Sequence, residues 1–314
     1  MTQGAGTEAA AGGLGDGLSS PPKEVQKRPA ATEEDLNHVF ELPEEFQHQL
    51  AFEYDMTRFP FLEALLPVLK EDEGTDLSKL HETEQGRFIL HHFRRRPQKV
   101  EVLGPRGNPW NRNFLSSAQH SPEAFRRLMA VYEDFLRSVV LSHLETDCIA
   151  FQTLPTFRCH MPGCGAPGRP HRDADYHHAH CEVNFWMPLT AVFGSNSLFA
   201  ESTRGAGDFR SFDLSVGWLM RFYGNQVWHY TVPNETESTR VSLDFRVIRR
   251  QDWSPGAFSF FKLGGYFSVM TADGVLPRGS AELRRLQEEM RSRPPSPRRG
   301  PRKDPFERGS KDDG

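Results

Sequence analysis

From about residue 153 onward, the chain is divided into short segments that are rich in β-branched and aromatic residues. Turn-forming residues separate these segments, as at Gly194-Ser195-Asn196 and Pro233-Asn234. Short strands that are regularly interrupted by turns are typical of an all-β sandwich or jelly roll. We expect strands at residues 153–159, 182–189, 197–201, 217–223 and 240–248.

The part of the chain before these strands has helical spacing. Residues 62–69 form a short apolar helix candidate, and apolar residues recur three to four positions apart from 122 to about 143. Ser121 and Pro122 supply the usual chemistry of a helix start, an N-cap followed by a proline at the first helical position. We therefore predict a mostly β fold with flanking helices, which pack against the outer face of the strands.

The two ends of the chain differ in composition from this core. Residues 1–35 contain no Phe, Trp, Tyr or Ile, and residues 291–314 are rich in Pro and charged side chains, with Phe306 as their one aromatic residue. Such segments bury too little apolar surface to offset the entropy that ordering costs. We expect a disordered arm at 1–35, one domain at 36–290 and a disordered tail at 291–314.

Charge and cysteine content argue against several classes of protein. The 38 Lys and Arg residues nearly balance the 42 Asp and Glu residues, whereas nucleic-acid binders usually have a basic face. No apolar run is long enough for a membrane span, and the N-terminus lacks a secretory pattern. The four cysteines are too few and too unevenly spaced for a disulfide scaffold. We expect a cytoplasmic protein whose partners include neither nucleic acid nor a membrane.

The strongest chemical signal comes from His171, Asp173 and His229. His171 and Asp173 lie two positions apart, so on a strand both would point to the same face. His229 follows after 55 intervening residues, and a jelly roll would bring it back to the same centre. Two His and one carboxylate on one face of a metal, with the other positions open, are typical of non-haem Fe(II) oxygenases. The open positions indicate a catalytic site, because a structural zinc would take four protein ligands.

The last predicted strand adds a candidate anion site. Arg240 and Ser242 share one face of this strand, and an inward guanidinium needs an anion because an unpaired buried charge is costly. The distal carboxylate of a dicarboxylate suits Arg240, with one more hydrogen bond from the Ser242 hydroxyl. The opposite face carries Val241, Leu243, Phe245 and Val247.

Together these motifs resemble the Fe(II)/2-oxoglutarate-dependent dioxygenases, in which H-x-D is followed by a distal His and then, after ten intervening residues, by R-x-S. Residues 217–247 also resemble the second half of phytanoyl-CoA-dioxygenase-like proteins. The sequence HRDADY followed by EVNFWMPLT is similar to the StrG-like hydroxylases of streptomycin gene clusters. The resemblance covers about residues 153–248 and implies a double-stranded β-helix, a distorted jelly roll.

The resemblance also implies a function and a set of cofactors. Fe(II) would be held by His171, Asp173 and His229, and 2-oxoglutarate would chelate it through the C1 carboxylate and the keto oxygen. Arg240 and Ser242 would hold the C5 carboxylate, and O₂ would take the remaining position. The expected reaction is hydroxylation of a small molecule with release of succinate and CO₂. An Asp at position 173, where halogenating relatives have a small residue, favours hydroxylation over chlorination.

Four further side chains are candidates for lining the pocket. Asn184 and Trp186 share one face of their predicted strand and are candidates for contact with the keto acid or the substrate, plain packing being the alternative for Trp186. Arg158 and Arg246 are candidate anchors for an anionic substrate, with surface ion pairs as the alternative.

Two alternatives concern the metal ligands. Asp175 would need a turn to reach the metal, because it lies four positions after His171, and Asp173 is therefore favoured. A zinc site is the other alternative, but the residues concerned lack zinc-ligand spacing and are better interpreted as loop residues at the pocket mouth. These residues are His177, His178, His180 and Cys181, with Cys159, His160 and Cys164 nearby.

Two other functions compete with the oxygenase hypothesis. A cupin-like protein would bind a metal or ligand without turnover, but the intact ligand spacing argues against it. A protein-modifying oxygenase of the JmjC type shares the metal ligands, yet such enzymes usually hold 2-oxoglutarate through a Lys and not through a strand Arg placed like Arg240.

Overall fold

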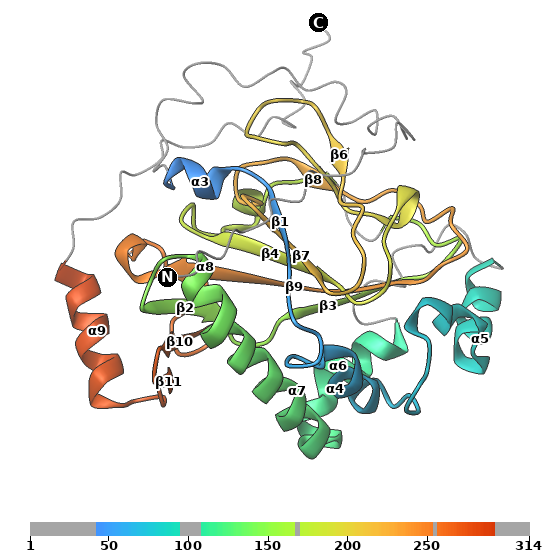
Figure 1. Ribbon diagram of the computed structural model, residues 1–314, viewed down its shortest axis with the longest axis horizontal. Helices are drawn as coiled ribbons and strands as arrows, with labels where there is room; N and C mark the ends of the chain where they lie inside the picture. The colour runs from blue at the N-terminus through green and yellow to red at the C-terminus, as the bar shows by residue number, and fades with distance from the viewer. Residues whose placement is uncertain (1–41, 95–107, 167–169, 254–255, 293–314) are drawn as a thin grey trace, which may run out of the picture.

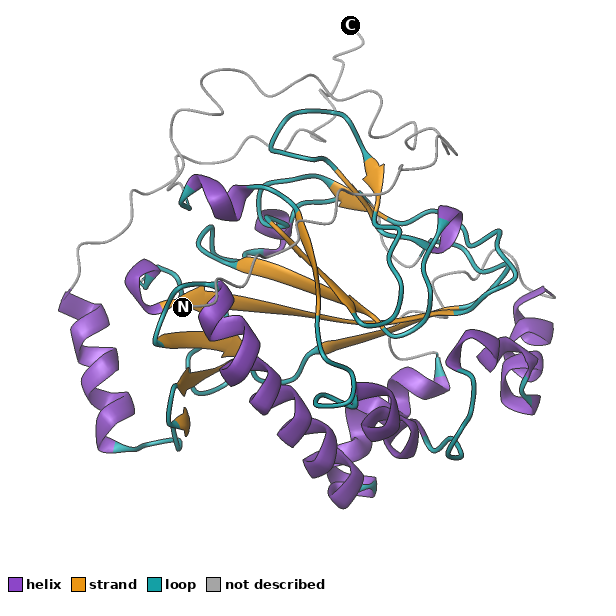
Figure 2. Ribbon diagram, viewed as in Figure 1, coloured by secondary structure: helices purple, strands orange, loops and turns teal. Residues whose placement is uncertain are grey.

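The computed structural model describes residues 42–94, 108–166, 170–253 and 256–292, which form two antiparallel sheets with helices packed beside them (Figures 1 and 2). The predicted arm at 1–35 and nearly all of the predicted tail at 291–314 lie outside the described residues. Among the residues that are described, no helix has the length and apolar character needed to cross a membrane.

The larger sheet is built around β9. Its order is β1-β7-β4-β9-β2-β10-β11, and β3 also pairs with β9, so that β9 is paired with three strands. The strands are β1 Leu50–Glu53, β2 Cys148–Gln152, β3 Thr156–His160, β4 Val183–Pro188, β7 Trp218–Phe222, β9 Arg240–Arg249, β10 Phe267–Thr271 and β11 Gly274–Val275.

The smaller sheet has three short strands in the order β6-β5-β8, with β5 at Phe199–Ala200, β6 at Arg210–Ser211 and β8 at His229–Tyr230. All five segments predicted as strands contain strands, and the prediction of a mostly β fold with flanking helices is confirmed. The double-stranded β-helix stays a prediction. The sequence analysis missed β1, β2, β6, β8, β10 and β11.

Most of the helices precede the strands of the site. The helix predicted from residue 122 to about 143 is continuous, because a π-helical turn at Leu136–Val140 joins α7 to α8. Ser121 occupies the N-cap position but makes no side-chain capping hydrogen bond. The helices are α3 Glu44–Gln47, α4 Phe61–Leu69, α5 Glu84–Arg94, α6 Pro109–His120, α7 Pro122–Phe135, α8 Leu141–His143 and α9 Ala281–Ser292; short 3-10 helices include Leu77–Glu82.

The two faces of β9 have different environments. Val241, Leu243, Phe245 and Val247 belong to the large apolar core between the sheet and the helices. Arg240 and Asp244, on the alternate face, line a pocket on the other side. The predicted alternation is therefore confirmed, and a shift of one residue in register would put the charged side chains into the core.

Aromatic side chains join the helices to this sheet. Tyr132 of α7 is fully buried, packs edge-on against Phe245 and donates its hydroxyl hydrogen to the Gln152 carbonyl oxygen at 2.9 Å. Phe135, one turn further along α7, is also fully buried and meets the rings of Tyr54, Phe59 and Phe61 at steep angles. Such edge-to-face pairs add to the free energy that burial itself contributes.

The packing predicts a large loss of stability when Phe135 is truncated. Phe135→Ala should lower the free energy of unfolding by about 3 to 5 kcal/mol, because it leaves a cavity among rings that are held by other contacts. Leu115→Ala is the control: Leu115 lies on α6 and is 55% exposed, so its loss should change stability by no more than about 0.5 kcal/mol. Urea unfolding measures both, and equal effects would contradict this description of the core.

Candidate metal and anion site

His171, Asp173 and His229 converge at one point. Their potential ligand atoms all lie within 4.8 Å of one another, and no other such group of three or more His, Cys, Asp or Glu occurs among the described residues. Backbone hydrogen bonds produce this convergence. His171 and His229 exchange two, at 3.1 and 3.0 Å, and the Asp173 amide donates to the Gly224 carbonyl oxygen at 3.0 Å.

The prediction that His171 and Asp173 lie on a strand is wrong. His171 takes part only in an isolated bridge with His229, and the chain turns at Asp173 into the 3-10 helix Asp173–Tyr176. Asp175, the alternative ligand, instead accepts hydrogen bonds from the backbone amide and the guanidinium of Arg172 at 3.0 and 3.2 Å. The carboxylate preferred from the sequence is thus the one at the centre, although the local conformation differs.

The geometry suits metal binding. The Asp173 Oδ1 atom lies 3.8 Å from His171 Nε2 and 3.6 Å from His229 Nε2. His229 Nδ1 lies 3.1 Å from the Val227 carbonyl oxygen. Because a carbonyl can only accept, Nδ1 carries the proton and the Nε2 lone pair is left for a metal.

The same surroundings keep these ligands in their metal-binding forms. Burial, with a further contribution from His171, lowers the pKa of His229 to about 4. Burial alone would raise the pKa of Asp173, but the charge of Arg246 and then that of His229 outweigh it and hold this pKa well below the usual range. At neutral pH the site therefore presents a neutral imidazole and a carboxylate, the forms that bind metals.

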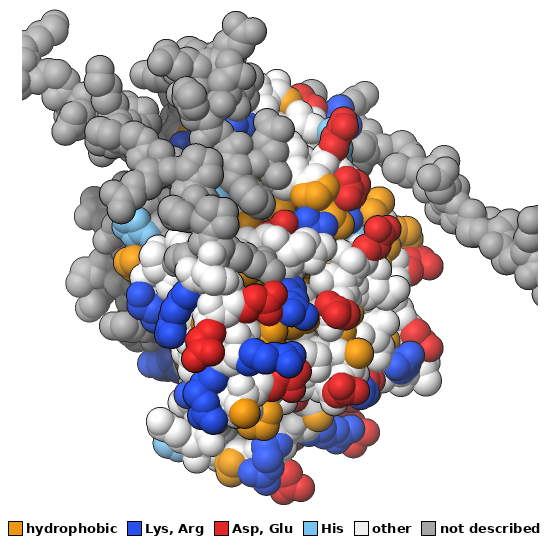
Figure 3. All heavy atoms as spheres, turned by 90° about the vertical axis from the view of Figure 1, so that its left-hand side faces the viewer, with side chains coloured by type: hydrophobic (Ala, Val, Ile, Leu, Met, Phe, Trp, Pro, Cys, Tyr) orange, Lys and Arg blue, Asp and Glu red, His pale blue; other side chains and the backbone are white. Residues whose placement is uncertain are grey.

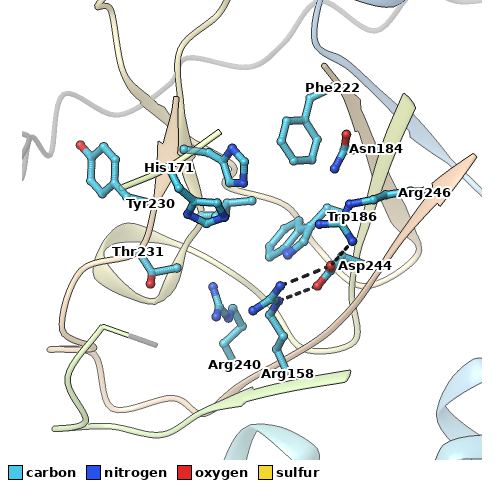
Figure 4. A pocket seen from close by; sticks show the side chains of 12 residues that line it. Arg158, His171, Asn184, Trp186, Phe222, Tyr230, Thr231, Arg240, Asp244 and Arg246 are labelled. Atoms are coloured by element: carbon cyan, nitrogen blue, oxygen red, sulfur yellow. Dashed lines mark hydrogen bonds and ion pairs between the residues drawn. The ribbon is translucent and has the colours of Figure 1, made fainter. Parts of the chain in front are cut away.

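Most of the residues predicted for the site line one pocket between the two sheets (Figure 4). Of the nine predicted, only Asp173 and Ser242 are not among the lining residues, and both are buried. Some lining residues were not predicted from the sequence, although two-residue alternation from His229 and Ser242 indicates two of them, Thr231 and Asp244. The missed residues are Leu198, Phe222, Tyr230, Thr231 and Asp244.

Arg240 is the most unusual group in this pocket. It is fully buried, and none of its three guanidinium nitrogens has a hydrogen-bond partner among the described residues. Burial and the nearby Arg158 lower its pKa to about 10, so it remains charged at neutral pH. The Oγ of Ser242 and the Oγ1 of Thr231 are also buried and without a partner in the described part of the chain. A carboxylate is the ligand that fits this set of unpaired groups.

The other polar residues predicted for the site have partners within the protein. Asp173 Oδ2 accepts hydrogen bonds from Asn184 Nδ2 at 2.6 Å and from Arg246 Nε at 2.8 Å. The alternative of a surface ion pair is wrong for Arg246, which is buried. Arg158 is more exposed and forms an ion pair with Asp244 at 2.6 Å, which agrees with the surface ion pair considered as the alternative for this residue.

No zinc site forms in the described part of the chain from the His and Cys residues near the pocket. His178 Nδ1 lies 2.7 Å from Glu182 Oε2, and His160 Nε2 lies 3.2 Å from the Cys164 carbonyl oxygen. These contacts are structural, because each satisfies a buried or half-buried ring nitrogen within the chain.

His160 predicts a pH dependence of stability. Burial and then the charge of Arg240 lower its pKa to about 3, whereas an unfolded His has a pKa near 6.5. Between these values the unfolded state binds the proton and the folded state does not, so stability should fall as the pH decreases from about 6.5. His160→Gln, which keeps a donor for the Cys164 carbonyl oxygen, should have a smaller difference in unfolding free energy between pH 7 and pH 5 than the wild type. Equal differences in urea titrations would contradict this.

Comparison with known proteins identifies one relative. No family model matches the chain. The streptomycin biosynthesis protein StrG of Streptomyces griseus is 28% identical over 228 residues, which cover 69% of this chain and 96% of StrG.

Several solved structures have a partial likeness to the chain, with low TM-scores. The ThoJ–Ni complex, a non-haem monooxygenase, has a TM-score of 0.37 and 14% identity over 74% of this chain and 80% of its own. The α-ketoglutarate-dependent epimerase SnoN has a TM-score of 0.34 and is 14% identical, over 53% of this chain and 64% of its own. A Pseudomonas putida prolyl-4-hydroxylase has a TM-score of 0.30 and is 21% identical, over 44% of this chain and 71% of its own. The resemblance to StrG that the sequence predicts is confirmed.

Proposed function

We propose that the protein is an Fe(II)/2-oxoglutarate-dependent oxygenase that hydroxylates a small molecule and releases succinate and CO₂. One observation carries this proposal: a set of two His and one carboxylate shares a pocket with a buried guanidinium that has no hydrogen-bond partner among the described residues. A metal ligand set alone fits many functions, whereas its combination with an unpaired inward Arg calls for an anionic ligand beside the metal.

The residues at the metal end fit iron. Two imidazole nitrogens and one carboxylate oxygen form the ligand set of non-haem Fe(II) oxygenases, which leaves positions open for a cosubstrate and O₂. When bound, the iron and 2-oxoglutarate supply the oxidising chemistry, and the protein supplies position and surroundings. His171, whose side chain is 24% exposed, lies on the more open side of the site, while His229 and Asp173 are buried.

The residues at the other end fit the distal carboxylate of 2-oxoglutarate. Arg240 offers two parallel N–H groups, and the hydroxyls of Ser242 and Thr231 can donate from beside it. Figure 4 shows Arg240 and Thr231 on the side of the pocket opposite Phe222. Asp244 pairs with Arg158 at 2.6 Å and makes no hydrogen bond to Arg240, so the Arg240 N–H groups are available to a ligand.

Part of the pocket wall is apolar. Trp186, Phe222 and Tyr230 are each at most 3% exposed and line it together with Leu198. Burial of Arg240 strengthens its attraction to a carboxylate, because the effective dielectric constant in a protein interior is lower than in water.

The competing functions have less support. A cupin-like protein that binds without turnover would not need a buried cation beside the metal. The JmjC-type hypothesis expects a Lys in the anion site, but in the described part of the chain the pocket is lined by Arg and contains no Lys.

The function is tested by succinate release from 2-oxoglutarate in the presence of Fe(II) and O₂, which many such enzymes perform slowly without their substrate. The wild-type protein should release succinate, and His171→Ala, Asp173→Ala and His229→Ala should abolish it because each removes a ligand. Asp175→Ala should have only a mild effect, since this carboxylate is bonded to Arg172. Iron binding near the wild-type level in the His variants would overturn the ligand assignment. If Asp175→Ala abolished succinate release and Asp173→Ala did not, the choice of carboxylate would be wrong.

Arg240 gives a second prediction. Arg240→Ala should weaken 2-oxoglutarate binding by about one to three orders of magnitude, because loss of a charged hydrogen-bond pair in a partly desolvated pocket costs on the order of 2 to 4 kcal/mol. Arg240→Lys should retain part of the affinity, since it keeps the charge but not the bidentate geometry. Calorimetric titration of the Mn(II)-loaded protein under anaerobic conditions measures this, with Mn(II) affinity as the control. Unchanged affinity in Arg240→Ala would mean that the cosubstrate is held elsewhere.

A further inference from the structure

The two oxygens of the Asp173 carboxylate have different surroundings. Oδ1 faces the two His rings, at 3.8 and 3.6 Å from their Nε2 atoms. Oδ2 accepts two hydrogen bonds, from Asn184 Nδ2 at 2.6 Å and from Arg246 Nε at 2.8 Å. One oxygen is thus directed to the metal position, and the other is bound to the protein.

The two donors are rigidly supported. Asn184 and Arg246 are paired across the neighbouring strands β4 and β9, and both are buried. The Arg246 guanidinium also donates from Nη1 to Gln152 Oε1 at 3.3 Å, and its Nε lies 3.8 Å from the buried Glu182 carboxylate. These contacts leave Arg246 little freedom to turn away from Asp173.

Gly224 gives Asn184 the space to reach Asp173. Its carbonyl oxygen accepts the Asp173 amide hydrogen, and a Cβ at this position would lie 2.7 Å from Asn184 Nδ2. Real Cβ atoms do not approach so closely, and this one would also lie 2.9 Å from the Phe222 ring, so a side chain here would force the amide, together with the ring, to shift. The close approach of the Gly224 backbone is therefore part of the same arrangement.

This arrangement matters because a carboxylate can bind a metal through one oxygen or through both. Binding through both would fill a further coordination position, and an oxygenase of this class needs its open positions for the cosubstrate and O₂. A carboxylate oxygen that already accepts two strong hydrogen bonds is a poor ligand, because metal binding would have to break them.

We propose that Asn184 and Arg246 restrict Asp173 to binding the metal through Oδ1 alone, and so keep a coordination position open. They act as positioning residues on the metal carboxylate, in place of the direct roles toward cosubstrate and substrate that the sequence predicts for them. This inference rests on the metal site of the proposed function.

The test uses Mn(II) alone and counts the exchangeable waters on the bound ion from the broadening of its electron paramagnetic resonance lines in ¹⁷O-labelled water. Arg246→Met and Asn184→Ala should each remove one of the two hydrogen bonds to Oδ2 and lower the mean water count, and the double variant, which removes both, should hold one water fewer than the wild type. Gly224→Ala should act like Asn184→Ala, because it displaces the amide while all the polar side chains remain.

Two controls separate this effect from general damage. Arg249→Met removes another buried Arg of β9, whose carboxylate partner is Asp252 at 2.7 Å, and should leave the water count unchanged. Arg240→Ala should weaken 2-oxoglutarate binding and also keep the wild-type count. In the Asn184 and Arg246 variants the water count and the 2-oxoglutarate affinity should both fall, the affinity by about 10- to 100-fold.

The outcomes are distinct. A wild-type water count in Asn184→Ala, Gly224→Ala and the double variant would overturn the inference while leaving the proposed function standing. Lower 2-oxoglutarate affinity in Asn184→Ala with an unchanged water count would also overturn it, and would assign Asn184 to the cosubstrate instead. Failure of the wild-type protein to bind Mn(II), or equal binding by His171→Ala, would overturn the proposed metal site itself.

Discussion

The two-faced packing of β9 is the constraint on which the rest of the structure depends. This strand pairs with β2, β3 and β4, and its apolar residues fill the core beneath the helices. Its alternate residues, Arg240, Ser242, Asp244 and Arg246, therefore lie on the pocket side. The energy of the apolar core fixes the register, and the register carries the polar groups into place. Stability and site geometry thus have one origin.

A strand that brings several charges into a buried pocket creates an electrostatic problem. Arg246 is paired with Asp173, and Arg158 with Asp244, which leaves Arg240 as a buried cation without a hydrogen-bond partner among the described residues. A buried charge without hydrogen bonds is costly, so a carboxylate that entered beside Arg240 would stabilise this site. The same pairing of Arg246 with Asp173 directs the carboxylate toward the two imidazoles. The charges therefore prepare one end of the pocket for a metal and the other for an anion.

Those parts of the fold and of the candidate site that follow a local sequence pattern could be predicted from the sequence. Strict alternation from Arg240 to Val247 revealed both faces of β9, and the spacing of His171, Asp173 and His229 indicated the ligands. By contrast, β2 is buried on both faces and has no alternation, so nothing in residues 148–152 marks it as a strand. Strand β8 has only two residues, too few for any pattern.

The roles of Asn184 and Arg246 could not be predicted, because they depend on how β4 and β9 are aligned. Their side chains meet Asp173 only because the register pairs Asn184 with Arg246 and because Gly224 leaves room for the amide. Likewise, Asp173 reaches the metal position from a 3-10 turn and not from a strand, since its backbone amide is bonded to the Gly224 carbonyl. Such long-range contacts leave no periodic signal in the sequence.

The most direct test of the account is the absorption of the wild-type protein loaded with Fe(II) under anaerobic conditions as 2-oxoglutarate is added. Chelation of the iron by the keto acid gives a metal-to-ligand charge-transfer band. We expect this band to appear, to saturate at one equivalent of 2-oxoglutarate per iron and to be abolished by Asp173→Ala. A protein that binds Fe(II) but develops no band at any concentration of 2-oxoglutarate would contradict it.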